Sequence, residues 1–426
     1  MFSRILNTFG TKSLSAAINL LIAILLSQYL GPAGKGVQSL VITTITFILV
    51  FSNLVGGATL VYLAPRYKAS LLVLPSYAWT LLTSIIAFFI LLIFPVIDRE
   101  FIIHACVLSV LNSLVSIHLS ILIGKEKIKT ANYIGLIQPL ALILSLGIFF
   151  MIFRQASIEA YIQSLYISFI LSLLASFYWF IKYCGPFGLQ PLRKYLGISR
   201  EMFLFGILNQ VAHVTQMLSF RLSYYVLDSY HGEAAVGVYS NGISLAESIW
   251  LIAKSISLVQ YARISNLNDK VKAADFTVRM IKVSLALSLL VLVPMLLLPS
   301  EFFAFLFGKG FEGTKTVIWT LAIGVLVYNF SILIGHYFSG TGRYYINAIT
   351  SSIGLIASLA LYFGLIPTYG QAGAGMATTL SYLITSLIFI IWFGKEYKGW
   401  YYMMIPQKKD ISDLRDEMKK MFAGKD

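Results

Sequence analysis

The first 97 residues contain no aspartate or glutamate, because Asp98 is the first carboxylate of the chain. Only 12% of all residues are charged, whereas 58% are apolar, and the mean hydropathy is +0.81. Soluble domains carry about 25% charged residues, so this composition excludes an ordinary soluble protein. The two cysteines, Cys106 and Cys184, are too few for a disulfide framework or a cysteine-based metal cluster. Each is expected to be a small buried apolar residue.

Twelve apolar stretches dominate the sequence, and each is long enough to cross a bilayer. About 20 apolar residues at 1.5 Å each span the hydrocarbon core. Long unbroken apolar runs predict helices rather than barrel strands, because strands would show short alternating segments. The sequence therefore predicts an all-α integral membrane protein with about 12 transmembrane helices. The predicted spans are residues 13–30, 37–63, 74–97, 101–123, 131–153, 159–182, 201–227, 234–261, 277–299, 314–338, 344–366 and 372–394.

The distribution of Lys and Arg predicts the orientation. With a cytoplasmic N-terminus, the predicted inner segments and the span ends that adjoin them carry 25 of the 32 Lys and Arg residues, whereas the outer loops and their adjoining span ends carry five. This asymmetry follows the positive-inside rule, and an even number of spans returns the C-terminus to the cytoplasm. Most of the net charge of +14 then faces anionic inner-leaflet lipid, so no nucleic-acid partner is expected. The first span shows no convincing cleavage site and is expected to be retained.

Two segments 201 residues apart follow one pattern. YLGPAGKGVQSL at 29–40 and YHGEAAVGVYSN at 230–241 share Tyr, Gly, Ala, Gly, Val and Ser at equivalent positions. Both fall at a predicted outer turn between two spans, as a duplicated unit of six spans predicts. Parallel repeats of this kind occur in transporters, whose two lobes then surround a central cavity. The predicted divisions are an N-lobe at 1–183, a cytoplasmic linker at 184–200, a C-lobe at 201–395 and a cytoplasmic amphipathic tail at 396–426.

Of the charged residues inside the predicted spans, Arg221, Glu247 and Lys254 lie farthest from the span ends, and all three fall in the second half of the chain. A charge at membrane depth costs at least about 2.5 kcal/mol on insertion scales, which makes these residues functional candidates. Two interpretations stay open. Arg221 could extend to the headgroups, and Glu247 and Lys254 could form a structural pair. Alternatively, Arg221 and Lys254 offer cationic positions at different depths to an anionic headgroup that crosses the bilayer.

Polar residues within the spans complete a candidate substrate cavity. The spacing of three and four residues predicts two shared helical faces. One face carries Gln210, His213, Arg221 and Tyr224, and the other carries Ser244, Glu247 and Lys254. A polar side chain in a helical bundle also commonly bonds a neighbouring helix, which is the structural alternative. Beside the three charged residues, the predicted cavity residues are Gln210, His213, Tyr224, Ser244, Asn19 and Asn53.

Motifs of soluble catalysis are missing from the sequence. There is no glycine-rich phosphate loop, no metal-spaced His/Cys set and no loop long enough to house a catalytic domain. A membrane-embedded glycan-processing enzyme is therefore disfavoured, and neither a cofactor nor a metal is expected. Coupling to a proton or sodium gradient stays open, with Glu247 or a histidine as the carrier. The first half contains no intramembrane carboxylate of the kind that such antiporters commonly use.

Three segments carry a resemblance to a known family. LGPAGKGVQSL, VGVYSNGISLAESIWLIAKSIS and YARISNLND resemble the polysaccharide (O-antigen) flippases of the multidrug/oligosaccharidyl-lipid/polysaccharide (MOP) exporter superfamily, and the resemblance runs from about residue 5 to 395. It implies twelve helices in two lobes around a central cavity. The duplicated six-span plan and the polar helical faces lead us to expect that the lobes work by alternating access. The implied cargo is an oligosaccharide repeat unit on a polyprenyl pyrophosphate, moved to the outer leaflet of a prokaryotic cytoplasmic membrane.

The resemblance also implies a setting and leaves alternatives. The setting is the assembly of O-antigen for lipopolysaccharide, of capsule or of exopolysaccharide, with membrane lipids around the protein and a polymerase and a chain-length regulator as partners. Another exporter of the superfamily is the first alternative. A lipid II flippase would be expected to show fourteen spans and several cationic residues in the first lobe. A drug antiporter would be expected to show acidic residues there.

Overall fold

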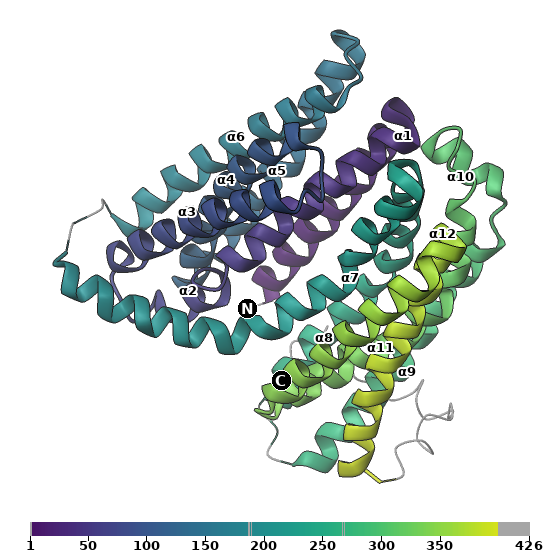
Figure 1. Ribbon diagram of the computed structural model, residues 1–426. Coiled ribbons are helices and arrows are strands. Elements are labelled where there is room, and N and C mark those ends of the chain that lie inside the picture. Colours follow the sequence, from purple (N-terminus) through teal and green to yellow (C-terminus); the bar gives the residue numbers. More distant parts are fainter. Residues whose placement is uncertain (1, 186–187, 189, 266, 268, 399–426) are drawn as a thin grey trace. The chain divides into compact units, whose positions relative to one another are not determined.

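Helices form every regular element of residues 2–185, 188, 190–265, 267 and 269–398, which the computed structural model describes (Figure 1). The predicted all-α fold is confirmed, because backbone groups in lipid must find their hydrogen bonds within the spanning segment. The helices are α1 (Phe2–Ser52), α2 (Gly57–Leu63), α3 (Ala69–Ile93), α4 (Arg99–Gly124), α5 (Ile128–Gly147), the π-helix η1 (Ile148–Ile152), α6 (Ile158–Cys184), α7 (Leu192–Ser248), α8 (Trp250–Ile264), α9 (Lys270–Leu297), α10 (Ser300–Phe307), α11 (Thr314–Gly340) and α12 (Tyr344–Glu396).

Nine helical stretches of the described residues are long and apolar enough to cross a membrane. Three of them, Gly10–Leu63, Gln210–Tyr261 and Tyr344–Glu396, contain 54, 52 and 53 residues. A straight helix of that length would measure about 80 Å, whereas the hydrocarbon core is about 30 Å thick. Each of the three therefore supplies two crossings, which gives the predicted twelve spans and makes the chain a multi-pass membrane protein.

Glycines break these three long stretches. Gly31 in α1, Gly232 in α7 and Gly370 in α12 have φ values of 67°, 75° and 55°. Gly31 and Gly232 combine this φ with ψ values of −176° and 174°, a region that residues with a Cβ hardly enter. Pro32 begins the next helical segment after Gly31, a position where a missing N–H leaves no helical bond unmade. The breaks fall in the gaps predicted between consecutive spans.

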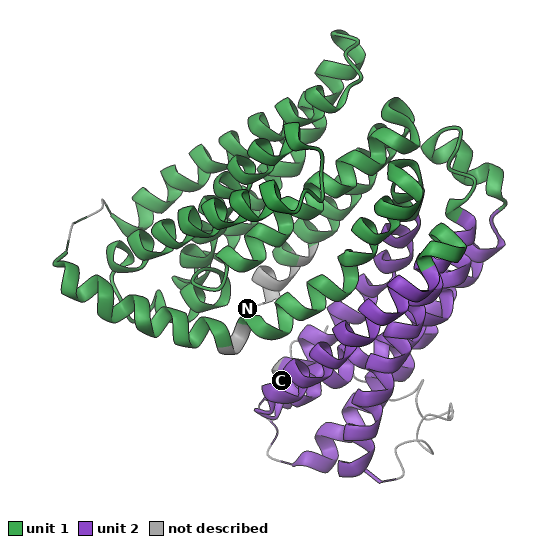
Figure 2. Ribbon diagram, in the orientation of Figure 1, with its two compact units in different colours: residues 1–241, 299–314, 366–371 green, residues 242–298, 315–365, 372–426 purple. Residues whose placement is uncertain are grey.

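The chain divides into two compact units (Figure 2). The first comprises residues 1–241, 299–314 and 366–371, and the second comprises residues 242–298, 315–365 and 372–426. The predicted N-lobe, linker and C-lobe stay predictions, as does the cytoplasmic location of both termini. The predicted amphipathic tail falls almost entirely on residues 399–426, which lie outside the described residues.

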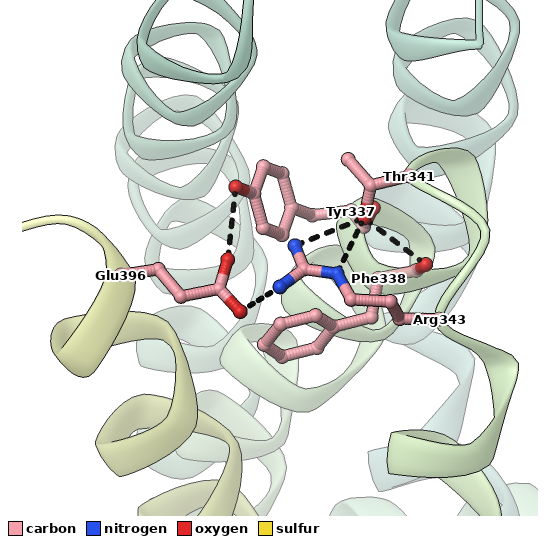
Figure 3. Close-up of polar contacts among 5 residues, drawn as sticks. All are labelled: Tyr337, Phe338, Thr341, Arg343 and Glu396. Atoms are coloured by element: carbon pink, nitrogen blue, oxygen red, sulfur yellow. Dashed lines mark hydrogen bonds and ion pairs between the residues drawn. The ribbon is translucent and has the colours of Figure 1, made fainter.

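The two halves of α12 run back along each other. Arg343, directly before the helix, pairs with Glu396 at its end, and Tyr337 donates to the same carboxylate at 3.4 Å (Figure 3). Nearer the break, the hydroxyls of Ser358 and Ser381 lie 2.5 Å apart. Contacts between residues at opposite ends of one helical stretch require that the chain reverses, so α12 is a helical hairpin.

The repeat at an offset of 201 residues corresponds to a contact in space. A Cβ added to Gly36 would overlap the carbonyl oxygen of Glu233, and a Cβ added to Gly237 would overlap that of Pro32. Gly36 and Gly237 are equivalent in the repeat, and so are Pro32 and Glu233. The second halves of α1 and α7 therefore meet backbone to backbone, which only glycine allows at these positions.

Two repeat-related serines continue this contact. Ser39 Oγ donates to Ser240 Oγ at 2.9 Å, and Ser240 Oγ donates onward to the carbonyl of Gly237 at 2.9 Å. Because Ser39 meets its own equivalent, a local two-fold axis passes between the two side chains. We call the contact formed by Gly36, Ser39, Gly237 and Ser240 the α1–α7 crossing.

Small residues also let α6 pack closely. Ser164, Ser168, Ser172 and Ser176 recur every four residues and are each at most 1% exposed. Small side chains at this spacing allow membrane helices to approach one another. Ser168 donates to a backbone carbonyl of α5 at 2.8 Å, and Ser176 bonds His118 of α4 at 2.9 Å. α6 is thus fixed to both α4 and α5.

Two helical segments differ from the expectation. α7 begins at Leu192, so the last residues of the predicted linker form its first turns. α10 lies between two predicted spans and buries Phe303 and Phe307, each 1% exposed. With eight residues it is too short to cross the bilayer, which explains why a search for spans does not find it.

Because backbones touch at the α1–α7 crossing, we expect a single added methyl group there to destabilise the fold. Gly36→Ala should lower the unfolding temperature of the purified full chain, because overpacking against backbone costs about 1–3 kcal/mol. Gly135→Ala in α5 is the control, since nothing lies within 4 Å of an added Cβ there. It should leave the unfolding temperature unchanged or raise it slightly. Equal effects of the two substitutions would argue against the crossing.

Candidate functional site

The predicted polar face of α7 meets different surroundings along its length. Gln210 is 8% exposed and its Nε2 donates to a backbone carbonyl of α1 at 3.1 Å. Tyr224 is 4% exposed and packs edge-on against a tyrosine in the second half of α7, with ring centroids 5.7 Å apart. Arg221 is half-buried, with its guanidinium 5.6 Å from the centroid of the Tyr224 ring, and His213 is exposed. The face is packed at its two ends and open between them.

Glu247, Lys254 and Ser244 lie in the second unit. The Glu247 carboxylate accepts a hydrogen bond from the Tyr382 hydroxyl of α12 at 3.0 Å. Lys254 and Ser244 are exposed, and the Lys254 ammonium lies 5.9 Å from the centroid of the Trp250 ring. α7 ends one residue after Glu247 and α8 begins two residues later, but Ile249 between the two helices keeps helical φ and ψ values of −58° and −31°. The predicted shared face of Ser244, Glu247 and Lys254 stays a prediction.

The two asparagines predicted to line the cavity, Asn19 and Asn53, differ in their surroundings. Asn53 Oδ1 accepts from the Ser116 hydroxyl of α4 at 3.1 Å, whereas Asn19 is exposed on α1. Asn53 and Gln210 thus make the helix-to-helix bonds of the structural alternative. The structure brings Arg221 beside Tyr224, and it bonds Glu247 of α7 to Tyr382 of α12. The role of the whole set as a cavity lining stays a prediction.

Lys35 is a residue that the sequence analysis overlooked as a site. Its side chain is 7% exposed, and the ammonium donates to Gln38 Oε1 and, at 3.4 Å, to Ser39 Oγ. Gln38 Nε2 donates in turn to the Tyr161 hydroxyl of α6 at 3.2 Å. The signal was present in the sequence, because Lys35 is the only charged residue between positions 13 and 65.

A pocket of about 410 Å³ lies within the first unit, lined by residues of α1, α4, α7 and the segment before α4. Asp98, Asp228 and Glu233 contribute three carboxylates to it, beside Arg99. Burial raises the pKa of Asp228, and the charge of Asp98 raises it further. Burial likewise raises the pKa of Glu233, followed by the charges of Asp98 and Asp228. The pocket therefore concentrates negative charge in the turns between the predicted spans.

No group of three or more His, Cys, Asp or Glu that could hold a metal occurs among the described residues. Cys106 is buried in α4 and Cys184 is half-buried at the end of α6, both as free thiols. His118 is fully buried and bonds the hydroxyls of Tyr77 and Ser176 through its two ring nitrogens. Its ring therefore joins α3, α4 and α6.

The chain is similar to solved structures of two transporters of the MOP superfamily and of a lipid II flippase. An inward-facing multidrug MATE transporter of that superfamily has a TM-score of 0.75 and 16% identity, covering 91% of this chain and 96% of its own. The lipid II flippase MurJ in an inward closed conformation has a TM-score of 0.69 and 17% identity, covering 93% and 90%. A MOP superfamily transporter from Pyrococcus furiosus has a TM-score of 0.66 and 15% identity, covering 93% and 95%. The chain has the MOP superfamily fold, as its sequence resemblance implied.

A curated relative is similar in sequence. The capsular polysaccharide biosynthesis protein CapF of Staphylococcus aureus is 23% identical over 272 residues, which cover 63% of this chain and 68% of CapF. No family model matches the chain.

The acidic pocket predicts a dependence of stability on pH. A carboxylate whose pKa is raised in the folded state destabilises that state while ionised, and the penalty disappears as the pH falls through the raised pKa. Asp228→Asn should therefore raise the unfolding temperature at pH 7, and its advantage should shrink as the pH is lowered. Thermal unfolding of the purified chain across the acidic range measures this difference.

The matched control is Glu100→Gln, which removes an exposed carboxylate of α4 that does not line the pocket. Its effect on the unfolding temperature should change little with pH. An advantage of Asp228→Asn that stays constant down to the lowest pH would contradict mutual repulsion in the pocket.

Proposed function

We propose that this chain is a flippase, which moves a polyprenyl-pyrophosphate-linked oligosaccharide repeat unit from the inner to the outer leaflet of a prokaryotic cytoplasmic membrane. The observation that carries the proposal is the MOP superfamily fold over 93% of the chain, matched with a lipid II flippase at a TM-score of 0.69. The likeness to a capsular polysaccharide biosynthesis protein supports a polysaccharide precursor as the cargo. O-antigen, capsule or exopolysaccharide assembly is the proposed setting.

Alternating access is the proposed mechanism. A polar glycan without hydrogen-bond partners in hydrocarbon costs several kcal/mol per group, so the sugar needs a polar path while the prenyl chain stays in lipid. Arg221 and Lys254 are proposed as cationic positions for the pyrophosphate. Arg221 is half-buried and Lys254 is exposed, so the two side chains differ in access. Polar cavity residues such as His213 and Ser244, both exposed, would contact the glycan.

A multidrug exporter is the second candidate function. The similarity to the inward-facing MATE transporter, at a TM-score of 0.75, favours it. The absence of any carboxylate before Asp98 argues against a cation-coupled antiporter with its acidic site in the first spans. A membrane-embedded glycan-processing enzyme is disfavoured, because the structures with this fold named above are transporters or flippases. Coupling to a proton or sodium gradient, and partnership with a polymerase and a chain-length regulator, remain part of the proposal.

Deleting the gene in the native host tests the cargo. Polyprenyl-linked oligosaccharide should accumulate on the inner leaflet, and surface polymer should be lost and then restored by the intact chain. Mass spectrometry of extracted lipids identifies the sugars. Normal surface polymer without any accumulated precursor would instead favour the exporter of drugs or of another lipid.

Substitution of the two proposed cationic residues tests the mechanism. Arg221→Ala and Lys254→Ala should each weaken the interaction with a pyrophosphate by about 1.5–3 kcal/mol, roughly tenfold to a hundredfold, and lower surface polymer. Lys129→Ala, at an exposed lysine of α5, is the control and should restore normal polymer. Membrane levels of each variant are measured alongside. Normal polymer from the Arg221→Ala/Lys254→Ala double variant would exclude the two residues as substrate contacts.

A further inference from the structure

Lys35 is unusual among the cations of this chain. Of the lysines and arginines whose burial the structure describes, it alone is buried, at 7% exposure. A buried charge is costly unless an opposite charge or a ligand compensates it. Its hydrogen bonds go only to the neutral side chains of Gln38 and Ser39, and no carboxylate of the described residues pairs with it. The site is therefore built around a cation without a protein counter-ion.

Several side chains around Lys35 carry hydrogen-bond donors, and the Ser39 proton, which Ser240 accepts in this structure, is released when the two helices separate. Gln38 contributes an amide group, whose Nε2 donates a hydrogen bond to the Tyr161 hydroxyl at 3.2 Å. Tyr161 is 2% exposed, and its own O–H can donate to another acceptor. Ser39 and Ser240 contribute hydroxyls. An ammonium, an amide and several hydroxyls match the many acceptor oxygens of a phosphate group, which lysine binds as a point charge.

The α1–α7 crossing adjoins this cluster. Ser39 links the two, because its hydroxyl is within 3.4 Å of the Lys35 ammonium and bonds Ser240 of α7 at 2.9 Å. The next residue after Lys35 is Gly36, which meets the backbone of α7. The contact consists of glycines and one serine pair, so no large side chains interlock within it that would have to repack when it opens.

We propose that Lys35 is an occluded binding residue for the diphosphate of the lipid-linked substrate, which reaches it once the α1–α7 crossing separates. The inference rests on the proposed function, because that function supplies a diphosphate. Lys35 then acts at a different stage of transport from Arg221 and Lys254. It holds the anionic group after the crossing has opened and loses it when Ser39 and Ser240 meet again.

Binding of a sugar-free polyprenyl diphosphate to the full chain in phosphatidylcholine nanodiscs tests the site. Lys35→Met removes the charge and keeps an unbranched side chain, whereas Lys35→Arg keeps the charge. Lys35→Met should weaken the affinity about tenfold to a hundredfold, and Lys35→Arg should weaken it much less. Lys309→Met, at an exposed lysine of the same unit, should bind like the unaltered chain. Unchanged affinity of Lys35→Met would overturn the proposal.

Two further probes identify the source of the phosphate. Inorganic pyrophosphate should also bind more weakly to Lys35→Met, because the site recognises the diphosphate rather than the prenyl chain. Phosphatidylglycerol in the nanodisc should bind both proteins alike. An equal loss of phosphatidylglycerol binding in Lys35→Met would make Lys35 a general headgroup contact and would overturn the proposal.

An engineered disulfide tests whether the closed α1–α7 crossing blocks access to Lys35. The Ser39→Cys/Ser240→Cys pair, with Cys106 and Cys184 replaced by serine, joins side chains whose oxygens lie 2.9 Å apart. Oxidation should abolish the affinity difference between chains with and without the Lys35→Met substitution, and reduction should restore it. Ser331→Cys/Ser386→Cys, whose oxygens lie 2.8 Å apart in the second unit, is the matched control and should leave the difference intact. A persistent difference in the oxidised Ser39→Cys/Ser240→Cys chain would show that the crossing does not cover the site.

The binding assay tests the Lys35 site and the deletion experiment tests the cargo, so a negative result in one is distinguishable from a negative result in the other. Diphosphate binding that depends on Lys35, in a host whose deletion accumulates no glycolipid, would keep the site and remove the proposed cargo. Accumulated glycolipid, together with a Lys35→Met chain that binds and restores polymer normally, would keep the function and remove the site. Lys35→Gln serves as the neutral variant if Lys35→Met does not fold, as judged by its unfolding temperature.

Discussion

Backbone hydrogen bonding inside hydrocarbon is the constraint on which the rest of this structure depends. Because no water is available there, each crossing has to be a helix whose bonds are internal. Reversals are then confined to a few residues between crossings. Gly31, Gly232 and Gly370 make three of these reversals within stretches that are otherwise helical from end to end. The hairpin of α12 shows the result, since residues 343 and 396 pair although a whole two-span helix separates them in sequence.

The duplicated segment acquires a physical meaning from this geometry. Gly31 and Gly232 recur because both adopt a backbone conformation that excludes a Cβ. The second repeated glycine pair permits the backbone contact of the α1–α7 crossing, and the repeated serines bond each other. The repeated tyrosine and alanine have no such explanation in the structure. A crossing built from equivalent residues of two repeats is a natural place for a transporter of this fold to open and close.

Charge is distributed in the first unit in a way that bears on the proposed transport. One lysine is buried beside the crossing, and three carboxylates gather in a pocket lined by the same two helices and α4. Lys35 would attract a diphosphate, whereas Asp98, Asp228 and Glu233 would repel one. Both sets are near the turns at the ends of the spans, so in the proposed transport they would act on a substrate that enters or leaves rather than on one midway across the bilayer.

Much of the fold could be read from the sequence. The spans followed from apolar length, and the breaks inside α1, α7 and α12 fall where consecutive spans were separated. Short elements were missed for physical reasons: α10 is too short to span, and the first turns of α7 lie in a basic, proline-containing segment that reads as a linker. The candidate site was predicted less well. Helical spacing placed Gln210, His213, Arg221 and Tyr224 on one face, but it could not tell that Gln210 and Tyr224 are packed while His213 is exposed.

The sequence by itself determined that this protein lies in a lipid bilayer and that its spans are helices. Hydrophobicity and run length are local properties that no later packing can reverse. The sequence also determined where the backbone needs glycine. Only the tertiary structure decided which residues meet: Gly36 with the backbone of α7, Ser39 with Ser240, and Lys35 with neutral partners. Burial of a single charge depends on which helices pack over it, and that information is absent from the periodicity of any one helix.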